Sequence, residues 1–146
     1  MKILTQTHDK IITKEKNGKI NGFLVPIYNV NDGVISPSQH PKQVYLTVVF
    51  PGHVKGPHLH KKRWGLFTCI KGNIKVIVKK EDVYEEYFSG QDHFYATIQV
   101  PAGAPAALQN IGDEDAYVLN MPAPAWRADQ QDEHPVSFDD YNFTWD

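Results

Sequence analysis

Two histidines separated by one residue, His58 and His60, are the side chains of this chain best suited to chemistry. On a β-strand, alternate residues point to the same side, so the His-x-His spacing projects both imidazoles from one face. Because imidazole titrates near neutral pH, such a pair can transfer protons or bind a metal ion. The same spacing also occurs in ordinary pairs of partly buried histidines, so this structural role stays open as an alternative.

Basic side chains gather around these histidines in the sequence. Lys55 precedes them, Lys61, Lys62 and Arg63 follow directly, and Arg127 lies further along the chain. Cationic groups in such a cluster suit the binding of a diphosphate. A run of this kind is also common in solvated turns, so phosphate binding is one of two interpretations.

Two tryptophans adjoin the basic residues, Trp64 beside Arg63 and Trp126 beside Arg127. Aromatic rings can stack on a base or on a sugar. Large apolar side chains serve at least as often in a core or in a subunit interface, so the role of both rings stays open.

Strands rather than helices must position these residues. Helical periodicity is nearly absent, and short runs rich in Val, Ile, Tyr, Phe and Thr alternate with clusters of Gly, Pro, Asn and Asp. The sequence predicts strands at residues 23–28, 44–50, 66–70, 74–79, 83–88, 95–100, 106–110 and 116–121. Turn-forming clusters, such as the one at 31–33, separate them, which is typical of an all-β sandwich or barrel.

One of these predicted strands, at 74–79, shows clean alternation. The pattern places Ile74, Val76 and Val78 on one face and Lys75 and Lys79 on the other. It therefore predicts a strand that is buried on one face and solvated on the other.

Length and composition predict a single domain. A chain of 146 residues, 41% hydrophobic and 22% charged, can bury one core without disulfides or metal clips. We expect residues 1–22 to form an N-terminal arm or strand, and residues 122–146 to form an irregular C-terminal arm that packs over the barrel.

Charge and cysteine content exclude several classes of partner. The formal net charge of −2 argues against a nucleic-acid binder that neutralises many phosphates. Cys69 is the single cysteine, so no intramolecular disulfide is possible; we expect it to be a small buried hydrophobe in a cytoplasmic protein. No apolar run is long enough to span a bilayer, so no membrane partner is expected.

Two segments of the chain together resemble the sequence motifs of the cupin family, G-x5-H-x-H-x3,4-E-x6-G and P-x-G-x2-H-x3-N. The residues that match, within one residue of the motif spacing, are Gly52, His58, His60, Gly72, Pro101, Gly103 and Asn110. The resemblance implies an all-β chain folded as the cupin double-stranded β-helix, which is a jelly-roll barrel.

Two ligands of the cupin metal site are missing from these motifs. Trp64 or Gly65 stands in the place of the glutamate, and Ala106 stands in the place of the second motif's histidine. A first-row metal in a cupin is held by all four ligands, and two imidazoles without a carboxylate bind it far more weakly. We therefore expect no metal and no other cofactor.

Longer stretches resemble two metal-free cupin groups, the dTDP-4-dehydrorhamnose 3,5-epimerase-like and the dTDP-sugar 3,4-ketoisomerase families. Residues 54–62 are similar to their RGxHxHKK stretch, with Lys55 in place of arginine, and residues 71–76 are similar to their xGxIKV strand. Residues 110–122 resemble the NIGDEEAxxLNxP segment of the epimerase-like group. The resemblance covers about residues 23–141.

This resemblance implies a metal-free epimerase or isomerase of a 4-keto-6-deoxysugar linked to dTDP or a similar nucleotide. His58 stands at the place of the family's catalytic histidine, which removes a proton next to the ketone, and His60 assists it or orients the sugar. In the family an aspartate of a C-terminal tail holds that histidine, and Asp140, or else Asp139, is expected to serve here. The residues expected to bind the substrate are Lys55, Lys61, Lys62, Arg63, Trp126 and Arg127.

One departure bears on the type of reaction. Trp126 stands where the epimerases carry the tyrosine of an NxPxxxYDPxDE segment. An indole cannot exchange a proton near neutral pH, which argues against a standard double epimerisation. A 3,4-ketoisomerase moves a proton between neighbouring carbons on one face and has less need of that tyrosine.

Two other functions stay open. The chain can be a non-catalytic cupin that binds a sugar nucleotide, or a metallocupin enzyme that recruits an unexpected ligand such as His53 or Asp92. Members of the resembled families typically form homodimers by exchanging or pairing N-terminal strands, which predicts a homodimer with its interface in residues 20–50.

Overall fold

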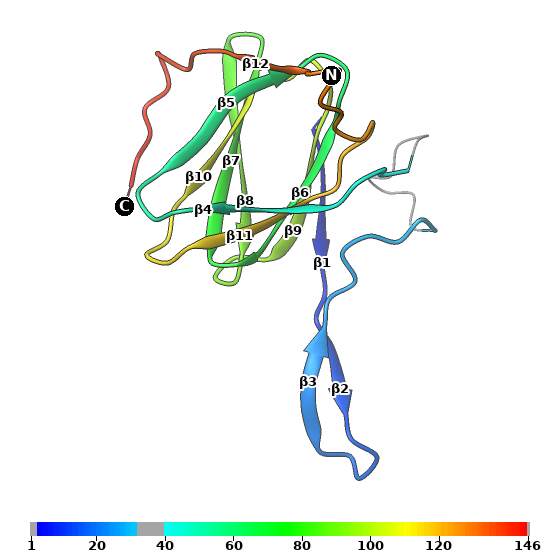
Figure 1. Cartoon of the computed structure of the whole chain (residues 1–146). Coiled ribbons are helices and arrows are strands. Elements are labelled where there is room, and N and C mark those ends of the chain that lie inside the picture. Colours follow the sequence, from blue (N-terminus) through cyan, green and yellow to red (C-terminus); the bar gives the residue numbers. More distant parts are fainter. Residues whose placement is uncertain (1–2, 32–39, 146) are drawn as a thin grey trace.

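Strands form the architecture of the described chain. The computed structural model describes residues 3–31 and 40–145, and within them it contains strands and no helix (Figure 1). The strands are β1 (Leu4–His8), β2 (Ile11–Lys14), β3 (Ile20–Leu24), β4 (Tyr45–Val49), β5 (Val54–His60), β6 (Gly65–Lys71), β7 (Asn73–Lys80), β8 (Val83–Gly90), β9 (Tyr95–Val100), β10 (Ala106–Asn110), β11 (Ala116–Asn120) and β12 (Glu133–Pro135). In this part of the chain, no helix has the length and hydropathy that a transmembrane segment requires.

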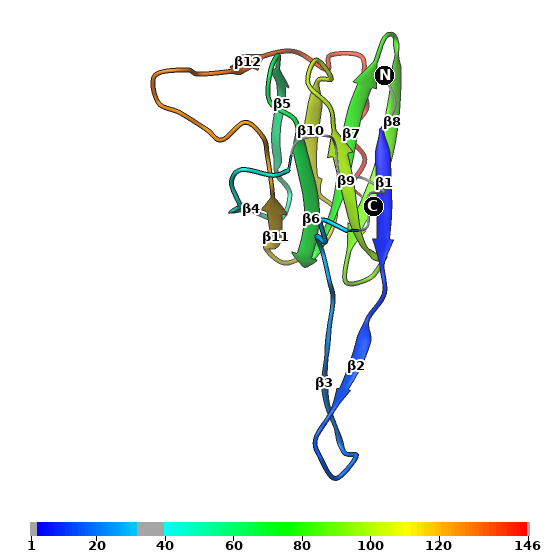
Figure 2. The same ribbon diagram turned by 90° about the vertical axis from the view of Figure 1, so that its right-hand side faces the viewer.

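Two five-stranded antiparallel sheets build the barrel. One has the order β1-β9-β6-β11-β4 and the other has the order β12-β5-β10-β7-β8. β2 and β3 form a separate hairpin, which projects away from the barrel in both views (Figures 1 and 2). Strands distant in the sequence are neighbours in each sheet, as in the jelly roll that the cupin motifs imply, and the predicted fold class is confirmed.

The strand predictions are right for most of the barrel. Those at 95–100 and 106–110 coincide with β9 and β10, and five others differ from the observed strands by one or two residues at an end. The prediction at 23–28 is wrong in its second half, because β3 ends at residue 24 and residues 27 and 28 pack beside Leu66 instead. The turn expected at 31–33 lies outside the described residues from position 32 onward.

Apolar side chains from both sheets meet in one core. Ile74, Val76 and Val78 of β7 are fully buried against residues such as Ile98 of β9. Burying each such side chain stabilises the fold by about 1.5–3 kcal/mol. Cys69 of β6 lies in the same core, and burial raises the pKa of its thiol to about 12, so it is the small buried hydrophobe that the sequence predicts.

The prediction that β7 has one solvated face is wrong. Ile77 is fully buried, and Lys75 is only 4% exposed. The C-terminal arm covers this face, because Phe138 and Tyr141 pack over Ile77. The ammonium group of Lys75 is retained there by Glu86, 3.7 Å away, and by the ring of Tyr141, whose centroid lies at 5.4 Å.

Candidate active site

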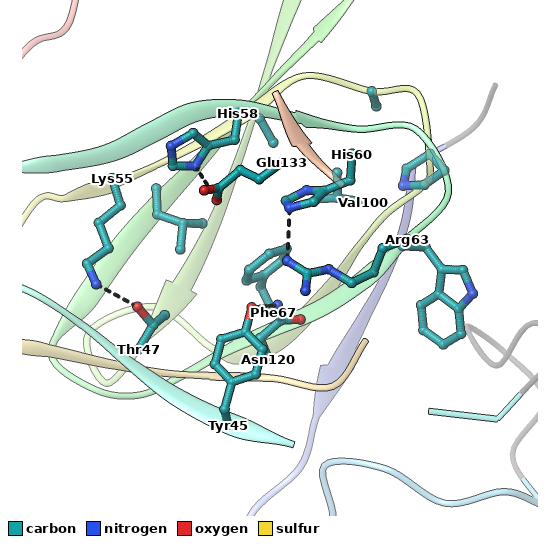
Figure 3. Close-up of a pocket in the computed structure, with 16 residues that line it drawn as sticks. Tyr45, Thr47, Lys55, His58, His60, Arg63, Phe67, Val100, Asn120 and Glu133 are labelled. Atoms are coloured by element: carbon teal, nitrogen blue, oxygen red, sulfur yellow. Dashed lines mark hydrogen bonds and ion pairs between the residues drawn. The ribbon is translucent and has the colours of Figure 1, made fainter. Parts of the chain in front are cut away.

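A cavity of about 290 Å³ lies between the two sheets, beside β5 (Figure 3). The polar side chains in its lining are those of Tyr45, Thr47, Lys55, His58, His60, Arg63, Asn120 and Glu133. Phe67, Val100 and Leu108 contribute apolar surface. Both imidazoles of the His-x-His pair therefore face the same cavity.

An irregularity in β5 places Lys55 on the same wall as His58. Ala106 of β10 pairs with His58. Two residues further along β10, Leu108 pairs with Lys55, which lies three residues before His58 on β5. Between the two pairs, β5 therefore carries one extra residue. The bulge lies at Gly56, which has a φ of 91° and where a Cβ atom would lie 3.0 Å from a backbone oxygen. Without it, Lys55 and His58 would point to opposite faces of the sheet.

Glu133 holds one nitrogen of His58. Its Oε1 lies 3.2 Å from Nδ1 of His58 (Figure 3). Glu133 begins β12, which pairs with the end of β5, so the backbone ladder brings the carboxylate to the ring. An ionised carboxylate only accepts hydrogen bonds, so Nδ1 carries a proton, and in the neutral ring the lone pair is therefore on Nε2. In that tautomer, Nε2 is the nitrogen that can accept a proton.

The structure corrects the expected partner of His58. In the described part of the chain, Asp140 accepts a hydrogen bond from the hydroxyl of Tyr84, and Asp139 accepts one from Ser137. The bond to Asp140 raises the pKa of Tyr84 to about 12 and holds the pKa of Asp140 below its usual range. Asp140 was expected beside β5, but the arm carries it to β8, and Glu133 takes its place.

His60 has a different partner and a different state. Nη2 of Arg63 lies 2.9 Å from Nε2 of His60. A guanidinium stays protonated and only donates, so Nε2 of His60 accepts, and the proton of the neutral ring sits on Nδ1. Burial lowers the pKa of His60 below its usual value of 6.5, and the charge of Arg63 adds to this effect. His60 is therefore a neutral donor rather than a base at neutral pH.

A carboxylate from the C-terminal arm fixes the loop that carries Arg63. Asp132 accepts hydrogen bonds from the backbone N–H groups of Lys61, Lys62 and Arg63, at 3.0, 2.8 and 2.9 Å. Partial burial raises the pKa of Asp132, but the three hydrogen bonds outweigh it and lower the pKa below its usual value of 3.8. The basic run is therefore an ordered turn held by its backbone.

Two further polar pairs line the cavity, one of them between β11 and β4 and the other between β5 and β4. Asn120 of β11 donates from Nδ2 to the hydroxyl of Tyr45 on β4, at 2.6 Å. Lys55 donates from Nζ to Oγ1 of Thr47, at 2.8 Å. Asn120 is 2% exposed, and among the described residues no donor reaches its Oδ1. Because the Tyr45 oxygen accepts from Asn120, its own proton is available to a bound molecule.

Four residues of the cavity were not expected from the sequence as site residues: Tyr45, Thr47, Asn120 and Glu133. One of them carried a signal, since Asn120 lies in the family-like stretch 110–122, whereas Glu133 lies two residues beyond the segment aligned on Trp126, which ends at Gln131. Tyr45 and Thr47 alternate on a predicted strand, which indicates that they share a face but not which face it is.

A second cavity, of about 480 Å³, adjoins the first and shares His60, Arg63 and Glu133 with it. The predicted substrate-binding residues in its lining are Lys62, Arg63, Trp126 and Arg127. Among the described residues, Lys61 is exposed and lines neither of these two cavities. The structure thus divides the predicted site residues between two adjoining spaces.

Potential metal ligands are dispersed over the described residues. Within 3–31 and 40–145, no three His, Cys, Asp or Glu side chains are grouped so that they can hold an ion. Asp92 accepts a hydrogen bond from Asn73 at the turn before β9, and His53 precedes β5, so neither joins His58 in its cavity. A third ligand from these two positions does not fit this geometry.

Two curated relatives match most of the chain. The spore coat polysaccharide biosynthesis protein SpsL of Bacillus subtilis is 21% identical over 139 residues, which are 89% of each chain. The probable low-salt glycan biosynthesis epimerase Agl13 of Haloferax volcanii is 25% identical over 107 residues, 68% of each chain.

Solved structures share the fold at low sequence identity. A dTDP sugar isomerase from Desulfovibrio desulfuricans G20 superposes with a TM-score of 0.79 at 18% identity, covering 98% of this chain and 90% of that one. The sugar 3,4-ketoisomerase QdtA from Thermoanaerobacterium thermosaccharolyticum, in complex with TDP, gives a TM-score of 0.68 at 17% identity, covering 92% and 88%.

The family assignment rests on a match over nearly the whole barrel. The model of the FdtA family, described as WxcM-like, C-terminal, matches residues 10–139. This range spans β2 to β12 and so includes the His-x-His strand, the loop after it and the carboxylates of the C-terminal arm. The protein therefore belongs to the FdtA family of WxcM-like C-terminal domains.

Proposed function

We propose that this protein is an isomerase that acts on a nucleotide-linked 4-keto-6-deoxysugar and uses His58 as its base. The observation that carries the proposal is the geometry of His58, whose Nδ1 lies 3.2 Å from Glu133 while the ring lines a cavity. Relatives named for polysaccharide and glycan biosynthesis, and similar structures described as sugar isomerases, support this substrate class.

Proton transfer next to the ketone is the central step. Nε2 of His58 takes the proton from C3, and the electron pair of that C–H bond forms a C3–C4 double bond, with the negative charge on the C4 oxygen. Lys55 and Tyr45 can donate hydrogen bonds to this oxygen. The protonated His58 then returns a proton to C4 while the proton of the C3 hydroxyl passes to the C4 oxygen, so that C4 becomes a carbinol and the ketone has moved to C3.

Of the two family reactions, 3,4-ketoisomerisation fits this site better than double epimerisation. It needs proton transfer on one face of the sugar, which one histidine can perform. Double epimerisation needs an acid on the other face, and Trp126, at the place of the family's tyrosine, lines the second cavity and cannot exchange a proton.

The second cavity offers a place for the nucleoside diphosphate. Lys62, Arg63 and Arg127 bring positive charge to it, and Trp126, 55% exposed, can stack on a base. Because the two cavities share His60 and Arg63, a ligand can extend from one into the other. Sugar and diphosphate would then lie on either side of Arg63.

Solvent deuterium incorporation tests the proposal. We expect dTDP-4-keto-6-deoxyglucose, incubated with the protein in D₂O, to gain deuterium at the carbon next to the ketone and to form a 3-keto product. The His58→Ala variant should lose at least about 100-fold in rate, the contribution of a general base. Binding without exchange would indicate a sugar-nucleotide-binding cupin, and stoichiometric metal in elemental analysis would indicate a metallocupin.

We also propose a homodimer and a cytoplasmic location. Large apolar side chains on the projecting hairpin and near β4 are each 48–62% exposed. They are Ile20, Phe23 and Leu24 on β3, Leu46 on β4, and Val44 directly before β4. A two-stranded hairpin is marginally stable alone, so a second copy would bury this surface. The predicted interface at 20–50 includes these residues, while 32–39 lie outside the described chain. Light scattering of Ile20→Lys, expected to yield monomer, tests the dimer.

A further inference from the structure

Asp132 connects two parts of the chain that are about seventy residues apart. Its two carboxylate oxygens accept three backbone N–H groups, from Lys61, Lys62 and Arg63, at 2.8–3.0 Å. These three residues directly follow β5, which ends at His60, and within the described chain they belong to no strand, so the carboxylate binds N–H groups that a backbone ladder does not. The conformation of this loop therefore depends on Asp132.

We propose that Asp132 is a positioning residue, which sets the loop at 61–63 so that the guanidinium of Arg63 binds Nε2 of His60. The result is a neutral His60 whose Nδ1–H is its remaining donor, suited to bind a hydroxyl or keto oxygen of a ligand. The role in turnover rests on the proposed function, whereas the effect on His60 does not.

The neighbouring residue completes the arrangement. Glu133 directly follows Asp132 and contacts His58, while Asp132 acts on His60 through Arg63. Backbone pairing of β12 with β5 places both carboxylates at once, with Glu133 opposite His60 in the register. Two adjacent acidic residues thus give two histidines opposite roles, one a base and the other a donor.

The charges around His60 allow a test, because the two possible effects of removing Asp132 would shift the pKa of His60 in opposite directions. The groups that face it are Arg63 on the loop, Asp132 and Glu133 on the arm, and His58 on its own strand. Burial and Arg63 lower the pKa of His60, whereas Glu133 and Asp132 raise it. Removing the charge of Asp132 alone would lower the pKa further, but releasing Arg63 and admitting water would raise it.

NMR titration of the His60 ring in the free protein decides between these outcomes. We expect Asp132→Asn to raise the pKa of His60, because the loop releases Arg63. A fall in that pKa, or no change, would overturn the proposal. Asp139→Asn serves as the matched control, since that carboxylate lies on the same arm and binds Ser137, and it should leave His60 unchanged.

A second variant keeps the test decisive if Asp132→Asn folds poorly. Arg63→Gln removes the guanidinium directly and should also raise the pKa of His60. The double variant should match Arg63→Gln, because both changes act through the same contact. A further rise in the double variant would contradict the proposed route.

Activity gives a separate readout. We expect Asp132→Asn to lower kcat/KM for the dTDP-4-ketosugar by about 10- to 100-fold, as a misplaced binding group does, and Asp139→Asn to leave it unchanged. If the wild-type protein shows no deuterium exchange at all, the proposed function fails, and the titration still decides the role of Asp132.

Discussion

The two halves of the C-terminal arm both carry acidic residues but have different roles. The first half, residues 124–135, lines the second cavity and places Asp132 and Glu133 at the histidine strand. The second half, residues 136–145, places Asp139 and Asp140 on Ser137 and Tyr84, away from that strand. Both halves contain acidic residues, so residue type alone does not explain the difference. The sheet edge that a carboxylate reaches decides its role.

Aromatic packing explains why the second half lies where it does. Phe138 and Tyr141 each have ring centroids 5.0 Å from that of Tyr84 on β8, and they cover Ile77 of β7. Phe143 continues this contact with Tyr141 at 4.7 Å. This half therefore seals the outer face of a sheet, whereas the first half builds a site at its edge.

The largest expected effect comes from breaking the aromatic half. Phe138→Ala should lower the free energy of unfolding by about 3–5 kcal/mol, because Phe138 is 6% exposed and its removal leaves a cavity. Urea denaturation measures this change. Deuterium exchange, measured where the variant is folded, should stay as in the wild type. If the folded Phe138→Ala variant incorporated deuterium into the substrate more slowly than the wild type, the two halves of the arm would not act independently.

Breaking the site-building half should affect turnover rather than stability. Glu133→Gln should slow deuterium exchange by about 10- to 100-fold with little change in KM, because the amide no longer stabilises the protonated ring of His58. Steady-state and exchange kinetics measure this. Asp140→Asn is the matched control, and an equal loss in both variants would remove the distinction between the two carboxylates.

The pH dependence of stability sharpens the comparison. The pKa of His60 is lowered in the folded protein, so the unfolded chain binds a proton first, and stability falls as the pH drops below 6.5. His60→Asn should show a smaller fall between about pH 7.5 and pH 5.5 in urea denaturation. If the free energy of unfolding changed equally with pH in the wild type and in His60→Asn, His60 would not be held neutral in the folded protein.

The smallest effect is expected at Asp140. Asp140→Asn should move the pKa of Tyr84 from about 12 toward its ordinary value of 10, because the carboxylate no longer accepts the phenolic proton. NMR titration of the tyrosine rings measures this. Tyr87, whose pKa of about 12 reflects its burial and its bond to Glu85, should not shift and is the internal reference.

Much of the barrel could be predicted because its strands carry their pattern locally. The alternation of Ile74, Val76 and Val78 identifies a core face, and the spacing of His58 and His60 places both rings on one side. Side chains that alternate on a strand share a face whatever the strand packs against. These inferences needed no knowledge of neighbours.

The failures concern contacts between segments far apart in the chain. Lys75 looked solvated because its cover, Tyr141, comes from the arm. The basic cluster in the sequence already includes Lys55, but only the bulge at Gly56, which strand alternation does not predict, brings its side chain to the wall of His58. Asp140 and Glu133 are both acidic residues near the C-terminus, and local sequence cannot tell which of them reaches His58.

The sequence by itself determined the all-β barrel, the shared face of the two histidines and the loss of two cupin ligands, because residue type and spacing suffice for each. Only the tertiary structure decided that Glu133 binds His58 and that Asp132 holds the loop of Arg63. The reason is that the pairing of β12 with β5, not the order of residues along the chain, sets which side chains meet.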